Sequence, residues 1–277
     1  MGQRFDDEVN NRRKILNSLG SAEERLLKAF SSDFCDLDNQ GGKITKSHIE
    51  RYLHSHREHY VELVNQVLIW APGRRIAEVG VAYGLTLLCL RDIYGYEVHA
   101  YELRENIPVY CKGLHKEGVP VHNWNLYDGN PPVAKGAFDM VICSEVVEHL
   151  YINLSAVLER IRPCLRIGGR LLLTTPNFYS ATNVLRVLRG KNICQEHPSN
   201  PRYENGLVLD AREHIREYTF AEVRNAFTIP KWQLRKIYYF GIPSANNVKQ
   251  NLLYSLSKWL LPYSVNNTLL AVSERRL

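Results

Sequence analysis

Residues 75–84 read Arg-Ile-Ala-Glu-Val-Gly-Val-Ala-Tyr-Gly, and this stretch decides the predicted fold. The apolar run 76–79 carries one acid, Glu78, and ends at Gly80, while Gly84 precedes a second apolar run. This order predicts a strand, a tight glycine turn and a helix. A glycine turn lets a ligand approach the backbone because glycine has no Cβ atom, and the first turn of a helix presents free N–H groups. The stretch therefore predicts a ligand-binding turn at the end of a strand.

Length and composition favour an ordinary globular chain. It has 277 residues, 45% of them hydrophobic, and no run reaches the roughly 20 apolar residues that span a bilayer. The first residues contain no apolar segment typical of a secretory signal. The six cysteines are scattered without a C-x-x-C pair, which predicts buried free thiols and a cytoplasmic location.

Further strands are predicted to end in polar residues. The run 96–101 is followed by Glu102, which lies 18 residues beyond Gly84, and a carboxylate there can accept hydrogen bonds from two ribose hydroxyls. The run 120–125 ends in Asn125-Leu126.

Residues 138–150 read Phe-Asp-Met-Val-Ile-Cys-Ser-Glu-Val-Val-Glu-His-Leu. This pattern predicts a strand at 140–143 and a helix that starts near Glu145. In a helix, Glu145, Glu148 and His149 would share one face because they are spaced i, i+3 and i+4. Two carboxylates and an imidazole that converge favour a divalent cation, with His214 as the expected fourth ligand.

The pattern Glu78-x-Gly80-x-x-x-Gly84, with Glu102 and the stretches 138–150 and 167–177, resembles the class I S-adenosylmethionine (SAM)-dependent methyltransferases. The resemblance covers about residues 74–177. It implies an α/β, Rossmann-like, seven-stranded sheet flanked by helices, with the last strand antiparallel. It also implies that Glu78 lies near the ammonium group of SAM, Glu102 beside the ribose and Asn125-Leu126 beside the adenine. Asn125 departs from the aspartate usual in that family, but it keeps a hydrogen-bond acceptor. The implied cofactor-binding residues are Glu78, Gly80, Tyr83, Gly84, Glu102, Leu103, Asn125, Leu126 and Ser144.

The Glu-x-x-Glu-His motif resembles two O-methyltransferase subfamilies. One contains the small-RNA 3′-terminal 2′-O-methyltransferases, which hold a divalent ion with two Glu and two His, and the other contains the O-methyltransferases of ubiquinone biosynthesis. In the metal interpretation, Glu145, Glu148, His149 and His214 bind Mg²⁺ or another divalent ion that lowers the pKa of the acceptor hydroxyl. Alternatively, His149 acts without metal as a general base and Glu148 is merely solvated, or His149 is structural. A metal-bound imidazole nitrogen cannot also accept a proton, so these roles exclude each other.

The domain organisation is predicted as an N-terminal helical cap at 1–70 and a cofactor-binding domain at 71–277. Within the cap we expect a helix that stops at Gly20, a capping box that begins at Ser21, and one long helix over 46–70. The polar, basic segment 178–212 is expected to be a lid or substrate loop. Apolar residues at 251–261 predict a helix that packs in the core or lies on a membrane surface.

The leading hypothesis is a SAM-dependent methyltransferase that acts on a hydroxyl of a small molecule, glycan or natural product. Residues 151–277 carry 18 Lys or Arg against 8 Asp or Glu, so Arg186, Arg189 and Arg216 are candidates for binding an anionic acceptor. The first alternative is an RNA 3′-end 2′-O-methyltransferase, although no RNA-binding module is recognisable. The second is a non-catalytic partner protein with the same fold. A homodimer is a further expectation.

Overall fold

The computed structural model describes residues 2–37, 43–129, 131–194, 203–204, 207–208, 214–241 and 266–277. The chain forms two compact units. The first comprises Met1–Ile142 with Pro163–Arg170, and the second Cys143–Arg162 with Leu171–Leu277. The helix expected at 251–261 lies outside the described residues, and the boundary expected at residue 70 stays a prediction.

One seven-stranded sheet has the strand order β10-β11-β7-β6-β3-β4-β5. Strands β3 and β4 pair in parallel, as do β4 and β5, whereas β10 and β11 pair antiparallel. This is the mixed, Rossmann-like sheet that the sequence predicts, and the fold class is confirmed. The strands span Arg75–Val79 (β3), Glu97–Glu102 (β4), Val121–Asn123 (β5), Phe138–Ser144 (β6), Leu165–Pro176 (β7), Trp232–Phe240 (β10) and Thr268–Arg275 (β11).

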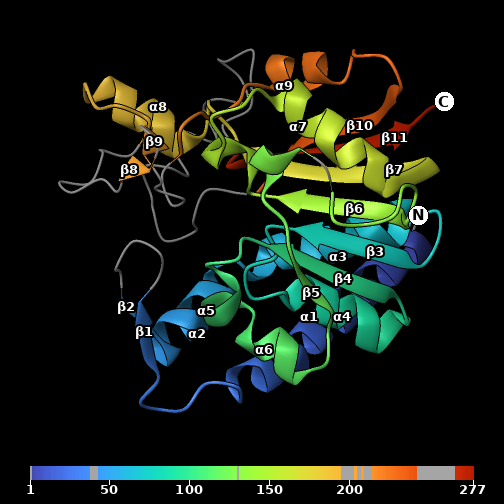
Figure 1. Ribbon diagram of the computed structural model, residues 1–277. Coiled ribbons are helices and arrows are strands. Elements are labelled where there is room, and N and C mark those ends of the chain that lie inside the picture. Colours follow the sequence, from blue (N-terminus) through green and yellow to red (C-terminus); the bar gives the residue numbers. More distant parts are fainter. Residues whose placement is uncertain are drawn as a thin grey trace. The chain divides into compact units, whose positions relative to one another are not determined.

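The first unit has a helical layer beside strands β3, β4 and β5 (Figure 1). Helix α1 packs against α3 and α4, and α4 packs against β4. Fully buried apolar side chains fill this layer, among them Leu19, Leu53, Val64 and Leu87. The helices are α1 (Gly2–Leu27), α2 (Lys46–Ser55), α3 (Arg57–Trp70), α4 (Leu85–Tyr94), α5 (Ile107–Tyr110) and α6 (Lys112–Lys116), and a short hairpin, β1 (Cys35–Leu37) with β2 (Lys43–Thr45), precedes α2.

Two helix boundaries differ from the sequence-based expectation. Helix α1 runs through Gly20 instead of stopping there, because Leu19, Ala22 and Leu26 form one buried stripe. Burial of that stripe outweighs the cost of about 1 kcal/mol for a glycine inside a helix. The single helix expected over 46–70 is also wrong, since His56 (φ −99°, ψ 10°) separates α2 from α3.

The second unit contains the C-terminal part of β7, strands β10 and β11, and helices α7 (Leu154–Ile161), α8 (Ala181–Leu188) and α9 (Phe220–Ala226). Helix α9 contacts both β10 and α7. It begins with a capping box, in which Thr219 and Glu222 satisfy each other's backbone N–H groups. Of the segment expected to be a lid, the structure describes α8, the residues up to 194, and the short pair β8 (Tyr203–Glu204) and β9 (Leu207–Val208).

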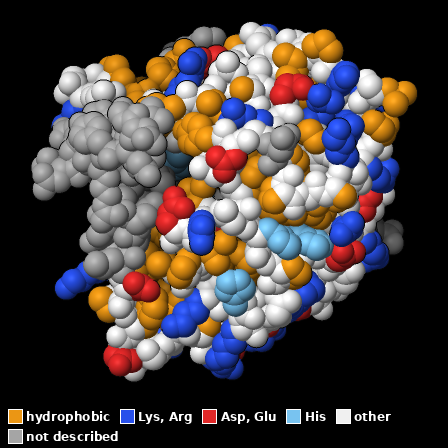
Figure 2. Space-filling model, in the orientation of Figure 1, with side chains coloured by type: hydrophobic (Ala, Val, Ile, Leu, Met, Phe, Trp, Pro, Cys, Tyr) orange, Lys and Arg blue, Asp and Glu red, His pale blue; other side chains and the backbone are white. Residues whose placement is uncertain are grey.

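Charged side chains of both signs lie on the molecular face shown in Figure 2. There, Lys and Arg are interspersed with Asp and Glu and with hydrophobic side chains. Among the described residues, no helix is both long and apolar enough to cross a bilayer.

Candidate functional site

The turn after β3 has the backbone geometry that its two glycines permit. Gly80 and Gly84 both have φ of 71°, in the left-handed region, and the Gly80 N–H donates to the Tyr101 carbonyl at 2.9 Å. Ala82 also has a positive φ, 46°, and its N–H donates to the Glu102 carboxylate at 3.0 Å. A Cβ atom on Gly84 would lie 2.4 Å from Leu114 Cδ1. The turn is therefore fixed by glycine at Gly84 and by Glu102 at Ala82.

Glu78 is a buried acid on β3, with 5% of its surface exposed. Its Oε2 atom has no hydrogen-bond partner among the described residues. Burial, with a smaller contribution from the charge of Glu102, raises the pKa of Glu78 to about 8. An unpartnered buried carboxylate oxygen fits a cationic ligand group, such as the ammonium of SAM.

Glu102, at the end of β4, holds the turn as well as offering a ligand site. Its Oε2 accepts from Ala82, while its Oε1 accepts from the Leu103 N–H at 2.8 Å and from Asn106 Nδ2 at 3.1 Å. Burial raises the pKa of Glu102 despite these three donors. A carboxylate has about four lone-pair positions, so one remains for a ligand hydroxyl.

The other expected cofactor residues have structural contacts of their own. The Tyr83 ring is buried between Tyr52 and Tyr110, with ring centroids 5.4 Å away in both cases. Asn125 Oδ1 accepts from the Tyr127 N–H at 2.9 Å and so caps a short 3₁₀ turn that begins at the buried Leu126. The cofactor roles of Tyr83, Leu103, Asn125, Leu126 and Ser144 stay predictions.

The chain after β6 is not the α-helix that the i, i+3, i+4 spacing predicts. Glu145 has φ of +53°, and only Val147–His149 form a 3₁₀ turn. The Glu145 N–H still bonds to the Thr174 carbonyl of β7 at 3.1 Å. The expectation of a helix from Glu145 is therefore wrong, because the chain leaves the sheet through a left-handed residue before it turns.

Two adjacent threonines of β7 hold the two acids of the motif. Thr174 Oγ1 donates to Glu145 Oε1 at 2.9 Å, and Thr175 Oγ1 donates to Glu148 Oε2 at 3.1 Å. Ser144 Oγ lies 2.8 Å from Thr174 Oγ1, which extends the first of these chains. Burial raises the pKa of Glu145 to about 7, and burial together with the charge of Glu145 raises the pKa of Glu148 well above its ordinary value.

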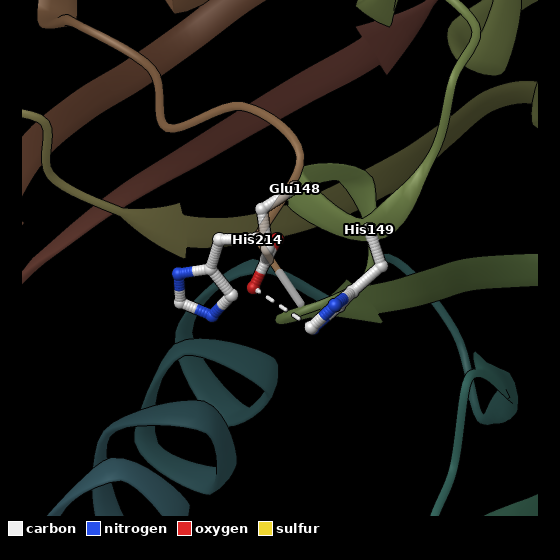
Figure 3. A group of neighbouring side chains, drawn as sticks. All are labelled: Glu148, His149 and His214. Carbon is white, nitrogen blue, oxygen red and sulfur yellow. Dashed lines mark ion pairs between the residues drawn. The ribbon is translucent and has the colours of Figure 1, made fainter. Parts of the chain in front are cut away.

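Glu148, His149 and His214 each offer one ligand atom, and these three atoms lie within 4.8 Å of one another. The view in Figure 3 draws the Glu148 carboxylate between the two imidazole rings, whose centroids lie 5.1 Å apart in an edge-to-face contact. The Glu148 Oε1 atom lies 3.9 Å from His149 Nε2, beyond hydrogen-bond distance, and has no hydrogen-bond partner among the described residues. Glu145, which the sequence also predicted as a ligand, is outside this group and accepts a hydrogen bond from Thr174.

Backbone hydrogen bonds bring His214 to this cluster from far along the sequence. The N–H groups of Ile215 and Arg216 both donate to the Glu148 carbonyl, at 2.8 and 3.2 Å. His214 Nδ1 lies 3.0 Å from Glu217 Oε1, a contact that sequence reasoning missed. The sequence signal for Glu217 was its position three residues after a candidate ligand.

The basic residues proposed for an anionic acceptor differ in their contacts. Arg186 bonds to the carbonyl oxygens of Asn192 and Cys194, and Arg216 pairs with Glu222. Arg189 is exposed at the end of α8. Two of the three guanidinium groups therefore have structural partners, and their role toward a substrate stays a prediction.

Comparison with known proteins assigns the family. The family model described as a methyltransferase domain matches residues 52–228, which is more than half of the chain. No curated protein matches the chain.

Solved structures share the fold at low sequence identity. A SAM-dependent methyltransferase from Thermotoga maritima, described as a possible histamine N-methyltransferase, is 14% identical with a TM-score of 0.55, over 83% of this chain and 96% of that one. A SAM-dependent methyltransferase from Archaeoglobus fulgidus is 13% identical with a TM-score of 0.55, over 81% of this chain and 99% of that one. The geranyl diphosphate C-methyltransferase of Streptomyces coelicolor, solved with Mg²⁺, geranyl diphosphate and S-adenosylhomocysteine, is 14% identical with a TM-score of 0.53, over 83% of both chains. The match to the family model, together with the seven-stranded sheet, the glycine turn and the buried acids Glu78 and Glu102, shows that this chain belongs to the methyltransferase domain family and is a SAM-dependent methyltransferase.

Proposed function

We propose that this enzyme methylates a hydroxyl oxygen of a small-molecule acceptor, and that a divalent transition-metal ion assists the transfer. The observation that carries the proposal is the cluster of the buried Glu148 with the half-buried His149 and His214. The cluster lies in the second unit, and the residues proposed for SAM, with the exception of Ser144, lie in the first.

The cofactor half of the proposal depends on two buried acids. Glu78 has an unpartnered oxygen suited to the ammonium group of SAM, and Glu102 retains an acceptor position suited to a ribose hydroxyl. In SAM the sulfonium itself makes the methyl group electrophilic, so no nucleophile of the protein is needed.

The donor set of the cluster supports a metal ion. A fully buried carboxylate without a hydrogen-bond partner at Oε1 is costly unless it is protonated or meets a cation, and two imidazoles lie beside it. One carboxylate with two imidazoles suits Mn²⁺, Fe²⁺, Co²⁺ or Zn²⁺ better than Mg²⁺, which prefers oxygen ligands throughout. Among the divalent ions that the sequence left open, we therefore favour a transition ion over Mg²⁺.

Each residue then has a defined task. Such an ion, when bound, would act as a Lewis acid that lowers the pKa of an acceptor hydroxyl. Glu148, His149 and His214 serve as ligands, and Thr175 fixes the second oxygen of Glu148. Glu145, which Thr174 orients, is a candidate to receive the acceptor proton because burial raises its pKa to about 7. His149 is assigned to the metal and not to general base catalysis.

RNA is the less favoured acceptor. A continuous basic patch is the usual electrostatic footprint of nucleic-acid binding, and on the face in Figure 2 the described basic side chains are mixed with acidic ones. A terminal ribose nevertheless carries adjacent hydroxyls, so short RNA belongs in the acceptor screen.

The test is methyl transfer from radiolabelled SAM to catechols, vicinal diols, sugars and short RNA, with metal-stripped enzyme. We expect methyl transfer to at least one hydroxyl acceptor. Chelation should abolish this activity, and Mn²⁺, Co²⁺ or Zn²⁺ should restore it. Glu148→Gln should abolish that restoration, whereas Glu97→Gln, which changes an exposed acid on β4, should not. Full activity of stripped enzyme in the presence of a chelator would refute the metal role.

A further inference from the structure

His214 has a second contact that determines which of its nitrogens is available. Its Nδ1 atom lies 3.0 Å from Glu217 Oε1, and Glu217 is buried while the His214 side chain remains 27% exposed. A carboxylate accepts and does not donate, so the hydrogen bond requires the proton on Nδ1 and leaves the lone pair of the neutral ring on Nε2. Ligating histidines commonly bond through their other nitrogen to a carboxylate in this way.

Glu217 is itself held by α8. Asn183 Nδ2 donates to Glu217 Oε2, and the same amide nitrogen lies 3.3 Å from the Asn177 carbonyl and 3.2 Å from the Phe178 carbonyl. Those two carbonyls can only accept, so they fix this end of the Asn183 amide as the donor. The contacts form a chain from α8 through Glu217 to His214.

Only a carboxylate satisfies both neighbours of Glu217 while the His214 proton stays on Nδ1. Asn183 and His214 each donate a hydrogen, one to each oxygen of Glu217. A glutamine there has one oxygen and one NH₂ group. With His214 in the Nδ1–H form, that NH₂ group would point at a donor of either Asn183 or His214. When that NH₂ group faces His214, the ring proton moves to Nε2 and removes the lone pair that a metal needs.

We propose that Glu217, supported by Asn183, is a positioning residue that fixes His214 in the Nδ1–H form and so presents Nε2 to a divalent transition ion. This inference rests on the proposed metal site and extends it, because it assigns the tautomer of one ligand and the residues that impose it. It also makes α8 part of the support of the site.

The first experiment needs no metal. Two-bond ¹H–¹⁵N spectra of labelled, metal-stripped protein at about pH 8.5, where an ordinary imidazole is neutral, report the tautomer of each histidine, and His214→Ala assigns the signal. We expect Nδ1–H in the wild type, and a shift toward Nε2–H or a mixture in Glu217→Gln and Asn183→Ala. Nε2–H in the wild type, or an unchanged tautomer in Glu217→Gln, would overturn the proposal.

The second experiment measures Co²⁺ affinity by absorption titration of the same proteins. We expect Glu217→Gln to weaken binding about 10- to 100-fold, the usual effect of losing such an outer partner. Glu97→Gln is the matched control, because Glu97 Oε1 lies 3.0 Å from a ring nitrogen of His99, outside the cluster, and it should bind Co²⁺ like the wild type. Co²⁺ affinity that is equal in Glu217→Gln and wild type would contradict the positioning role. If the wild-type protein bound no Co²⁺ but His214 were in the Nδ1–H form, the proposed metal site would be refuted, whereas the control of the His214 tautomer by Glu217 would remain supported.

Discussion

The affinity of the enzyme for S-adenosylhomocysteine should depend on pH through Glu78. Burial, then the charge of Glu102, raises the pKa of this acid to about 8. An ammonium group of the ligand pairs with the ionised carboxylate, so binding should be accompanied by release of the Glu78 proton.

The magnitude follows from the fraction of Glu78 that is ionised in the free protein. With a pKa of about 8, that fraction is about 1% at pH 6 and about 9% at pH 7. Because the apparent Kd equals the intrinsic Kd divided by the competent fraction, it should fall about ninefold over that one unit.

Calorimetric titration in two buffers of different ionisation enthalpy measures both the Kd and the proton release. Glu78→Gln should bind more weakly than the ionised wild type, and its Kd should be nearly independent of pH over this range. The substitution should leave the fold intact, since the wild-type carboxyl is largely protonated in the free protein at neutral pH. A wild-type Kd that is constant from pH 6 to 7, without proton release, would refute the assignment of Glu78 to the ammonium group.

Two stability predictions follow from local geometry, and chemical denaturation measures both. Gly84→Ala should lower the free energy of unfolding by about 2–5 kcal/mol, because it adds a left-handed backbone cost and an overlap with Leu114. The control is Gly118→Ala, which has the same φ of +71° but no neighbour within 4 Å, and it should lower the free energy of unfolding by only about 1–2 kcal/mol. Equal losses in the two variants would contradict the overlap. Glu222→Ala should lose about 1 kcal/mol at neutral pH through the capping box with Thr219. Although partial burial alone raises the pKa of Glu222, its hydrogen bonds hold it below the ordinary value, so this stabilisation is present above the unfolded pKa and is lost as the pH falls through the folded one; a loss that persists undiminished at about pH 2 would contradict it.

The central sheet and the places of Glu78 and Glu102 in it could be predicted because short-range patterns determine them. An apolar run that ends in an acid and a glycine turn needs little else to become β3 and its loop, and Glu102 follows from the same logic at the end of β4. The helix boundaries at Gly20 and His56 could not be predicted in this way, because tertiary packing decides them.

The candidate metal cluster shows where local patterns stop being informative. The i, i+3, i+4 spacing suggested one helical face, yet Glu145 adopts a left-handed conformation and bonds to Thr174 of β7. His214 joins Glu148 through backbone hydrogen bonds across more than sixty residues of sequence. Asn183 was missed because its contact with Glu217 joins distant segments that no local period encodes, whereas Glu217 lies only three residues after His214.

The most direct test of metal-assisted transfer is electron paramagnetic resonance of Mn²⁺ added to stripped protein, with and without S-adenosylhomocysteine. We predict stoichiometric binding by the wild type that is lost in Glu148→Gln and His214→Ala and retained in His99→Ala. Unbound Mn²⁺ in every wild-type sample, or binding that survives both cluster substitutions, would contradict the account.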